Sequence, residues 1–221
     1  MEGLVWLSSF PRSGNTFLRT VLANCFALKS ASLYVRDLGN DPQVERMAGH
    51  IEQIDGRIDF GPQTLHLVKT HGAPLNDAPA IYIVRDGRDA TVSLYHFLKG
   101  QVPLEDIAAG KSRFGSWSAH LGAWAPAGRA QTLFLRYEEL AADLQSSIDR
   151  IGGFLERDPV SRSLPSRDEL ARTGAKWVRP VDAPRIRLQG EALRRYWETN
   201  GDAMAAYGYS QDNRAVAGRS A

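Results

Sequence analysis

The chain has 221 residues, 43% of them hydrophobic and 24% charged, with a formal net charge of +2. This composition is ordinary for a globular protein with a substantial core. The small charge favours neither nucleic acid nor an anionic membrane as a partner, although a local basic site for an anion is compatible with it. Cys25 is the one cysteine, which excludes an internal disulfide. We expect a cytoplasmic protein, because no apolar run reaches membrane-spanning length and the first residues do not form a signal peptide.

Residues 4–28 are predicted to form a strand, a tight loop and a helix. A short apolar run comes first, a turn rich in small and polar residues follows, and apolar residues then recur at helical spacing from position 17. This arrangement aims backbone N–H groups and a helix N-terminus at one point, which attracts phosphate. Arg12 adds a permanent positive charge there, and further side-chain donors come from Ser13, Asn15 and Thr16.

The loop differs from the nucleotide-binding pattern G-x-x-x-x-G-K-[ST], because Ser9 stands at the first glycine position and no lysine follows Gly14. Its sequence, PRSGNTF, instead resembles the 5′-phosphosulfate-binding loop of sulfotransferases, whose usual form is PKSGTTW. That resemblance implies that Arg12 contacts the bridging and 5′-phosphate oxygens and that Phe17 stacks on adenine. The alternative is an ordinary strand-to-helix connection with a capping serine or asparagine.

Two further strands are predicted over residues 64–70 and 80–85. Lys69 and His71 stand at the carboxyl end of the first strand, and Arg85 at the end of the second. Ligands of open α/β sheets gather at this edge, so these side chains are expected near the Arg12 loop. The alternatives are a solvent-exposed histidine and a structural ion pair between the arginine and Asp86 or Asp89.

The segments after these strands also resemble the sulfotransferases. VKTHGAP is similar to the family's KTH segment, which implies that His71 is the catalytic base and that Lys69 assists. IYIVRDGRDATVSLYHF is similar to the family's 3′-phosphate-binding segment, YVVRNPKDVAVSYYHF, which implies that Arg85 and Ser93 bind that phosphate. Ser93 lies about two turns into a helix predicted over residues 90–98.

The next elements add weaker signals. A helical face is predicted from Trp117, His120, Leu121 and Trp124, similar to the family's GSW-x-x-H-x-x-x-W helix, and its histidine could face an acceptor pocket or be a buried structural residue. A strand is predicted over residues 131–137, followed by a helix to about residue 151. TLFLRYEEL resembles a family segment whose tyrosine lies beside adenine, which implies that role for Tyr137. A final helix is predicted over residues 191–207.

The C-terminal part departs from the family. Cytosolic sulfotransferases carry an RKG-x-x-GDW segment whose Arg, Lys and Gly reach the 3′-phosphate. Here Arg179 aligns with that arginine, the Lys and Gly are absent, and Arg185 or Arg187 could substitute for them. The oligomeric state is not predicted, because the dimerisation segment of many cytosolic members is not recognisable.

Residues 1–221 are therefore interpreted as a single α/β domain with a central, mainly parallel sheet flanked by helices, a P-loop-like phosphosulfate-binding loop and a disordered tail from about residue 211. The resemblance implies a sulfotransferase that uses 3′-phosphoadenosine-5′-phosphosulfate (PAPS), needs no metal and releases adenosine 3′,5′-bisphosphate (PAP). The acceptor would be a hydroxyl or amine of a small molecule. Two alternatives stay open: a P-loop kinase or nucleotide hydrolase, and a catalytically silent nucleotide-binding protein.

Overall fold

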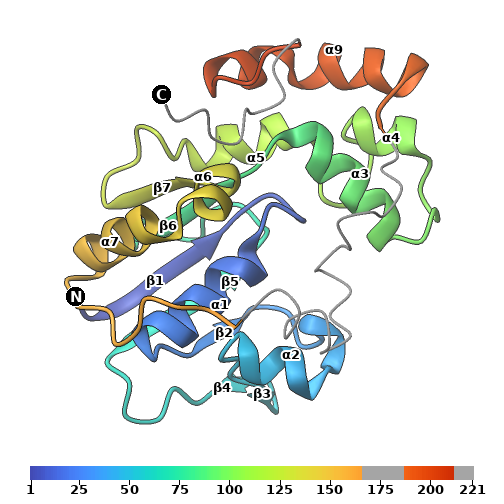
Figure 1. The fold of residues 1–221 in the computed structure, drawn as a ribbon. Coiled ribbons are helices and arrows are strands. Elements are labelled where there is room, and N and C mark those ends of the chain that lie inside the picture. Colours follow the sequence, from blue (N-terminus) through green and yellow to red (C-terminus); the bar gives the residue numbers. More distant parts are fainter. Residues whose placement is uncertain (166–186, 212–221) are drawn as a thin grey trace.

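The computed structural model describes residues 1–165 and 187–211 (Figure 1). Its centre is a five-stranded sheet in the order β2-β5-β1-β6-β7, and every pair of neighbouring strands is parallel. A separate antiparallel pair is formed by β3 and β4. The strands are β1 Gly3–Ser8, β2 Ser30–Ser32, β3 Gln53–Ile54, β4 Arg57–Ile58, β5 Leu65–Thr70, β6 Ala80–Val84 and β7 Thr132–Arg136. The predicted α/β class with a parallel central sheet is confirmed.

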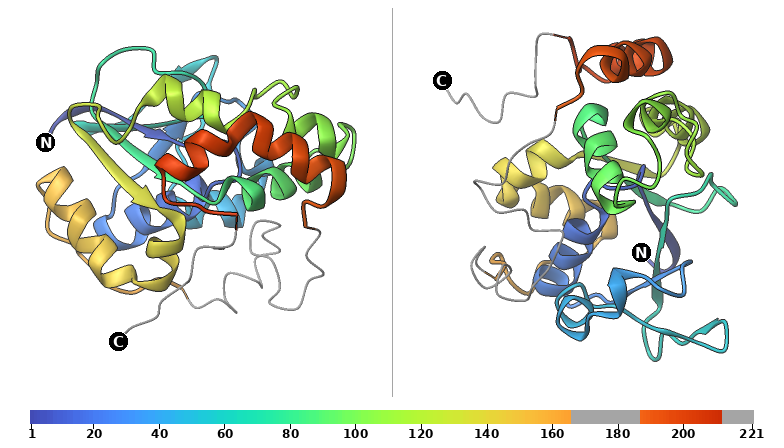
Figure 2. Two further views of the ribbon diagram at one scale, coloured as in Figure 1. Left: turned by 90° about the horizontal axis from the view of Figure 1, so that it is seen from above. Right: turned by 90° about the vertical axis from the view of Figure 1, so that its right-hand side faces the viewer.

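Helices cover both faces of the sheet (Figures 1 and 2). One face carries α1, α6 and α7, the other carries α3, α4, α5 and α9, and α2 lies near the β3–β4 pair. The helices are α1 Asn15–Phe26, α2 Pro42–Met47, α3 Gly87–Phe97, α4 Leu104–Ala108, α5 Trp117–Trp124, α6 Tyr137–Ala142, α7 Leu144–Leu155 and α9 Gly190–Ala206, with a 3-10 turn at Leu38–Asn40. Within the described ranges, none of these helices is long and apolar enough to cross a membrane.

Two hydrophobic cores sandwich the sheet because successive strand residues point to opposite faces. In β6, Tyr82 and Val84 pack in the core shared with α3, α5 and α9, whereas Ile81 and Ile83 pack in the core shared with α1 and α7. Burial on both faces explains why the strands read as nearly continuous apolar runs in the sequence.

Two of the differences from the sequence prediction concern the edge of the sheet and the helices after β7. Strand β2, Ser30–Ser32, was not predicted, because its small side chains have no apolar pattern, and it becomes a strand by pairing with the edge of β5. The helix predicted up to residue 151 is two helices, α6 and α7. They are separated at Asp143, whose carboxylate caps α7 by accepting from the backbone N–H of Ser146.

Helix α9 packs against the start of α3 where only glycine fits. A Cβ atom at Gly87 would collide with Tyr196 Oη and lie 2.9 Å from the Trp117 ring. Tyr196 and Trp117 are among the largest fully buried side chains, so neither has room to withdraw. The left-hand view of Figure 2 shows α9 lying across this face of the molecule.

We therefore expect Gly87→Ala to lower the free energy of unfolding by about 1–3 kcal/mol, as overpacking a core does. Urea denaturation measures the effect. Gly122→Ala is the matched control, because that position is exposed in α5 and has open space around it; it should be neutral or stabilise by up to about 1 kcal/mol. Equal stability of the two variants would contradict the close packing of α9.

Candidate active site

Four strands end at one edge of the sheet and bring the predicted site residues together there. The loop 9–14 joins β1 to α1, His71 directly follows β5, Arg85 follows β6, and Tyr137 follows β7. Because β5, β1, β6 and β7 are consecutive neighbours in the sheet, these residues lie along the same edge, as the sequence argument expected.

The loop after β1 has a conformation that depends on its contacts. Arg12 has φ 68° and Gly14 has φ 103°, both in the left-handed region. An arginine in this region is uncommon and is maintained by its surroundings. Gly14 is required by space as well, because a Cβ atom there would overlap the Tyr137 ring and lie 3.3 Å from Ile83 Cδ1. Gly14 itself occupies the N-cap of α1, and no side chain of the described residues caps this helix, unlike the ordinary capped connection considered from sequence.

Unpartnered polar atoms are concentrated at this edge. In the part of the chain that the structure describes, five buried side-chain polar atoms lack a hydrogen-bond partner. They are Ser8 Oγ, Ser13 Oγ, Asn15 Oδ1, Arg85 Nε and His120 Nε2. Ser8 ends β1, Ser13 lies in the loop, Asn15 begins α1 and Arg85 follows β6. His120 lies in α5, where its ring meets Phe10 of the loop edge-on at 6.1 Å. Buried polar groups are nearly always paired in native proteins, so this concentration makes the edge the candidate site for a polar ligand.

Arg12 reaches across to α3. Its Nε donates to Ser93 Oγ at 3.2 Å, and its guanidinium lies over the Phe97 ring, 5.3 Å from the centroid. The structure thus joins two residues that the sequence assigned to opposite ends of one nucleotide. Ser93 had been selected only through its family resemblance.

Arg85 contacts the same loop from β6. Its Nη1 donates to the Arg12 carbonyl at 3.3 Å, and its guanidinium lies over the Tyr137 ring at 4.6 Å. The ion pair considered from the sequence also exists, with Asp89 at 3.6 Å, but that carboxylate is half exposed and leaves Arg85 Nε unpartnered. The Tyr137 ring in turn meets the Phe17 ring edge-on at 6.2 Å, so the two rings assigned to adenine are neighbours.

Lys69 takes part in a buried ion cluster that the sequence did not reveal. Lys69 Nζ lies 2.5 Å from Asp37 Oδ1, and Arg19 Nη1 lies 2.5 Å from the other carboxylate oxygen, Oδ2. Burial alone would raise the pKa of Asp37, but the two cations outweigh it and lower that pKa to about 2. Burial lowers the pKa of Lys69, and Asp37 opposes that shift. Asp37 lies at the start of a polar segment without periodicity, which is why no pattern indicated it.

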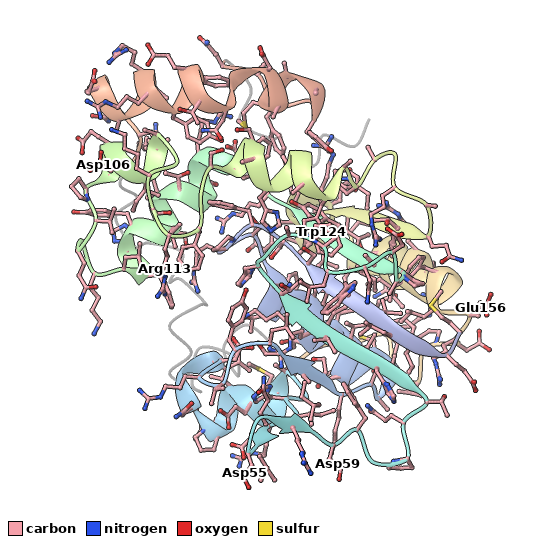
Figure 3. All side chains as sticks on the ribbon, turned by 180° about the vertical axis from the view of Figure 1, so that it is seen from behind. Asp55, Asp59, Asp106, Arg113, Trp124 and Glu156 are labelled. Carbon is pink, nitrogen blue, oxygen red and sulfur yellow. The ribbon has the colours of Figure 1, made fainter. Side chains whose placement is uncertain are left out.

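We expect Asp37→Asn to lower the free energy of unfolding by about 3–5 kcal/mol at neutral pH, because two buried cations lose their carboxylate. The folded-state pKa lies below the unfolded value of 3.8, so this contribution is present above that pH and is lost as the pH falls from 3.8 toward 2. Urea denaturation across this range measures it. Asp55→Asn, on the exposed β3–β4 turn (Figure 3), is the control. A pH-independent difference between Asp37→Asn and the unsubstituted protein would contradict this assignment.

His71 has a defined tautomer. Its Nδ1 lies 2.8 Å from the Ser9 carbonyl oxygen, which can only accept, so Nδ1 carries the proton and Nε2 keeps its lone pair. Tyr34 covers the ring by stacking at 5.8 Å and accepts from the backbone N–H of His71. Burial, reinforced by the charge of Lys69, lowers the pKa of His71 to about 3. This pKa lies well below the near-neutral value that suits histidine to base catalysis, but the imidazole is neutral and its Nε2 is an acceptor.

His120 is buried in α5, with 7% of the residue exposed. Its Nδ1 lies 2.7 Å from the Tyr82 hydroxyl, while Nε2 lacks a partner among the described residues. Burial lowers the pKa of His120 to about 4, and the backbone of His71 offsets part of that shift, so the two histidines are neighbours. Tyr82 could have been anticipated, since a tyrosine inside a buried strand needs a partner for its hydroxyl.

For the remaining predicted residues the structure gives a position in the fold and little else. Thr16 lies in the first turn of α1. Arg187 is exposed just before α9, and both Arg179 and Arg185 lie outside the described residues, as does most of the predicted tail. Within residues 1–165 and 187–211, His, Cys, Asp and Glu side chains form no group of three that could hold a metal ion.

Comparison with known proteins agrees with this geometry. Residues 3–167, about three quarters of the chain, match the family described as Sulfotransferase domain. The chain belongs to the sulfotransferase family. The matched range contains every predicted site residue except the C-terminal arginines Arg179, Arg185 and Arg187.

Two human sulfotransferases illustrate the relationship. Sulfotransferase 2B1 is 32% identical over 183 residues, covering 73% of this chain and 48% of the human protein. Sulfotransferase 1E1 is 25% identical over 178 residues, covering 69% of this chain and 59% of the human protein. This sulfotransferase chain thus spans about half the length of the curated relatives that it matches.

Solved structures share the fold. Mouse sulfotransferase SULT7A1 complexed with PAP gives a TM-score of 0.52 at 23% identity, covering 80% of this chain and 64% of the mouse chain. Retinol dehydratase in complex with androsterone and PAP gives a TM-score of 0.59 at 17% identity, covering 96% of this chain and 82% of that chain. At these identities the likeness shows the fold of this chain alone.

Proposed function

We propose that this sulfotransferase transfers a sulfuryl group in line from PAPS to a small-molecule acceptor. One observation carries the proposal: unpartnered buried polar atoms gather beside Arg12 and Arg85 at the edge where the phosphosulfate-type loop lies. Such a set of donors suits a polyanionic ligand. The PAP complexes of SULT7A1 and retinol dehydratase support PAPS as the donor, and the androsterone complex supports a small organic acceptor.

The loop and the two arginines are assigned to the donor nucleotide. The 5′-phosphosulfate would be held by Arg12 with the loop and helix-start residues Ser13, Gly14, Asn15 and Thr16. Arg85 and Ser93 would hold the 3′-phosphate, and Phe17 and Tyr137 would bind adenine. Positive groups around the leaving phosphate stabilise the charge that develops as the bond to sulfur breaks, which is the main catalytic effect expected for this kind of transfer.

His71 is proposed as the base. A new bond forms between the acceptor atom and sulfur, the bond between sulfur and the 5′-phosphate oxygen of PAPS breaks, and PAP leaves with that electron pair. The acceptor's proton passes to His71 Nε2, the nitrogen that the Ser9 contact leaves unprotonated. Lys69, at the end of the same strand, is proposed to assist at the sulfuryl group while its charge is balanced by Asp37.

We expect PAP to raise the melting temperature more than ADP or ATP does, without Mg²⁺, because a ligand of the folded state stabilises it by mass action. Arg85→Ala should weaken PAP binding by about 1.5–3 kcal/mol, the value of a hydrogen bond to a charged group, and abolish the preference over ADP. Arg162→Ala removes an equal charge from an exposed pair with Asp149 and serves as the control. Equal stabilisation by PAP and ADP, or an ATP preference with Mg²⁺, would favour a kinase or nucleotide hydrolase instead.

We expect His71→Ala to reduce sulfuryl transfer about 10²–10⁴-fold, the usual loss for a missing general base, with little change in PAP affinity. A turnover assay with PAPS and an acceptor panel measures the rate, and calorimetry measures PAP binding. His66→Ala is the control, because that ring stacks on Phe60 near the start of β5. Near-normal turnover by His71→Ala would show that the base is another residue, and absence of transfer by the unsubstituted protein would indicate a silent nucleotide-binding protein.

A further inference from the structure

The two histidines beside the loop present opposite hydrogen-bonding groups. His71 donates from Nδ1 to a carbonyl, so its Nε2 is a hydrogen-bond acceptor. His120 uses Nδ1 toward the Tyr82 hydroxyl, and its own Nε2 is buried without a partner. The tautomer of His120 is therefore decided by the direction of its hydrogen bond with Tyr82.

The direction of the bond between Tyr82 and His120 follows from the number of buried donors and acceptors that each arrangement leaves without a partner. If His120 donated from Nδ1, the Tyr82 proton and the His120 Nε2 lone pair would both be left unsatisfied. If the hydroxyl donates, the ring's Nε2–H is the single unsatisfied donor. The second arrangement is less costly, and Tyr82 is fully buried and therefore cannot turn to water.

We propose that Tyr82 holds His120 as an Nε2–H donor, and that His120 and His71 together select a hydroxyl acceptor over an amine. The inference rests on the proposed sulfuryl transfer and goes beyond it by choosing between the two acceptor classes. Tyr82 is a positioning residue here, because it acts through His120. His120 contacts the acceptor oxygen directly.

The selection follows from lone pairs. A hydroxyl oxygen has one hydrogen and two lone pairs, so it donates its hydrogen to His71 Nε2, accepts from His120 Nε2–H with one pair and attacks sulfur with the other. A neutral amine nitrogen has one lone pair, which must attack sulfur, and it leaves the buried His120 donor unpaired. Sites built to pair with a substrate hydroxyl reject analogues that cannot make the bond by up to about 10⁴–10⁵-fold.

The tautomers can be observed without turnover. In ¹⁵N NMR spectra near neutral pH, His120 should be protonated at Nε2 and His71 at Nδ1. His66, whose Nε2 lies 3.0 Å from the Gln63 carbonyl, provides an internal example of the Nε2–H form. Protonation of His120 at Nδ1 would overturn the inference even if sulfuryl transfer is established.

The acceptor contact is tested first with phenol added to the PAP-bound protein. Phenol should shift the His120 Nε2–H resonance, and the absence of a shift would overturn the inference. The preference itself is tested under turnover with PAPS, with phenol and aniline as matched acceptors. In Tyr82→Phe the ratio of hydroxyl to amine turnover should fall about 10–100-fold, the usual effect of losing a group that orients a functional histidine, with the loss mainly in KM for the hydroxyl. Tyr95→Phe, which removes the hydroxyl from a ring that meets the His96 ring edge-on in α3, should leave the ratio unchanged.

These outcomes separate the inference from the proposed function. The predicted tautomers and phenol shifts, together with a complete absence of sulfuryl transfer from PAPS, would refute the function and leave the hydroxyl-binding assignment intact. Sulfuryl transfer with an unchanged hydroxyl-to-amine ratio in Tyr82→Phe would support the function and refute the assignment.

Discussion

In the central sheet, Ser8 of β1 is paired with Thr70 of β5, and this register sets the geometry of the site. The next residues along each strand, Ser9 and His71, leave the sheet side by side, which brings the Ser9 carbonyl to His71 Nδ1. A slip of one residue would send every side chain of the strand to the opposite face and place core residues such as Leu67 in the wrong layer. Hydrophobic packing far from the loop thereby determines which nitrogen of a histidine is free to accept a proton.

Positive charge gathers at this edge, and the protein balances part of it internally. Asp37 accepts from both Lys69 and Arg19 in a buried cluster next to β5, whereas the carboxylate that Arg85 meets among the described residues, that of Asp89, is half exposed. Arg85, whose Nε lacks a partner among the described residues, thus retains hydrogen-bonding capacity on the β1–β6 side. This asymmetry explains why the unpartnered buried atoms lie around the loop rather than around Asp37.

Burial keeps both histidines neutral, so their chemistry is set by hydrogen bonds rather than by charge. The pKa values are lowered to about 3 for His71 and about 4 for His120, chiefly because desolvation disfavours the protonated ring. A neutral imidazole is a donor at one nitrogen and an acceptor at the other, and its partner decides which is which. The Ser9 carbonyl accepts from Nδ1 of His71, whereas the Tyr82 hydroxyl donates to Nδ1 of His120. The Nε2 atom is therefore an acceptor in His71 and a donor in His120.

The sequence by itself determined the α/β class and the strand-loop-helix at the N-terminus, because continuous apolar runs identify buried parallel strands. It also determined that Arg12, His71 and Arg85 converge at one edge, because the loops at the carboxyl ends of parallel strands must meet there. Local patterns also revealed most helices. Only the tertiary structure decided the contacts across elements: strand β2, the burial of Asp37 between two cations, and the bond from Tyr82 to His120. Each of these joins residues far apart in the chain, and their spacing along it carries no information about which polar groups will share a buried environment.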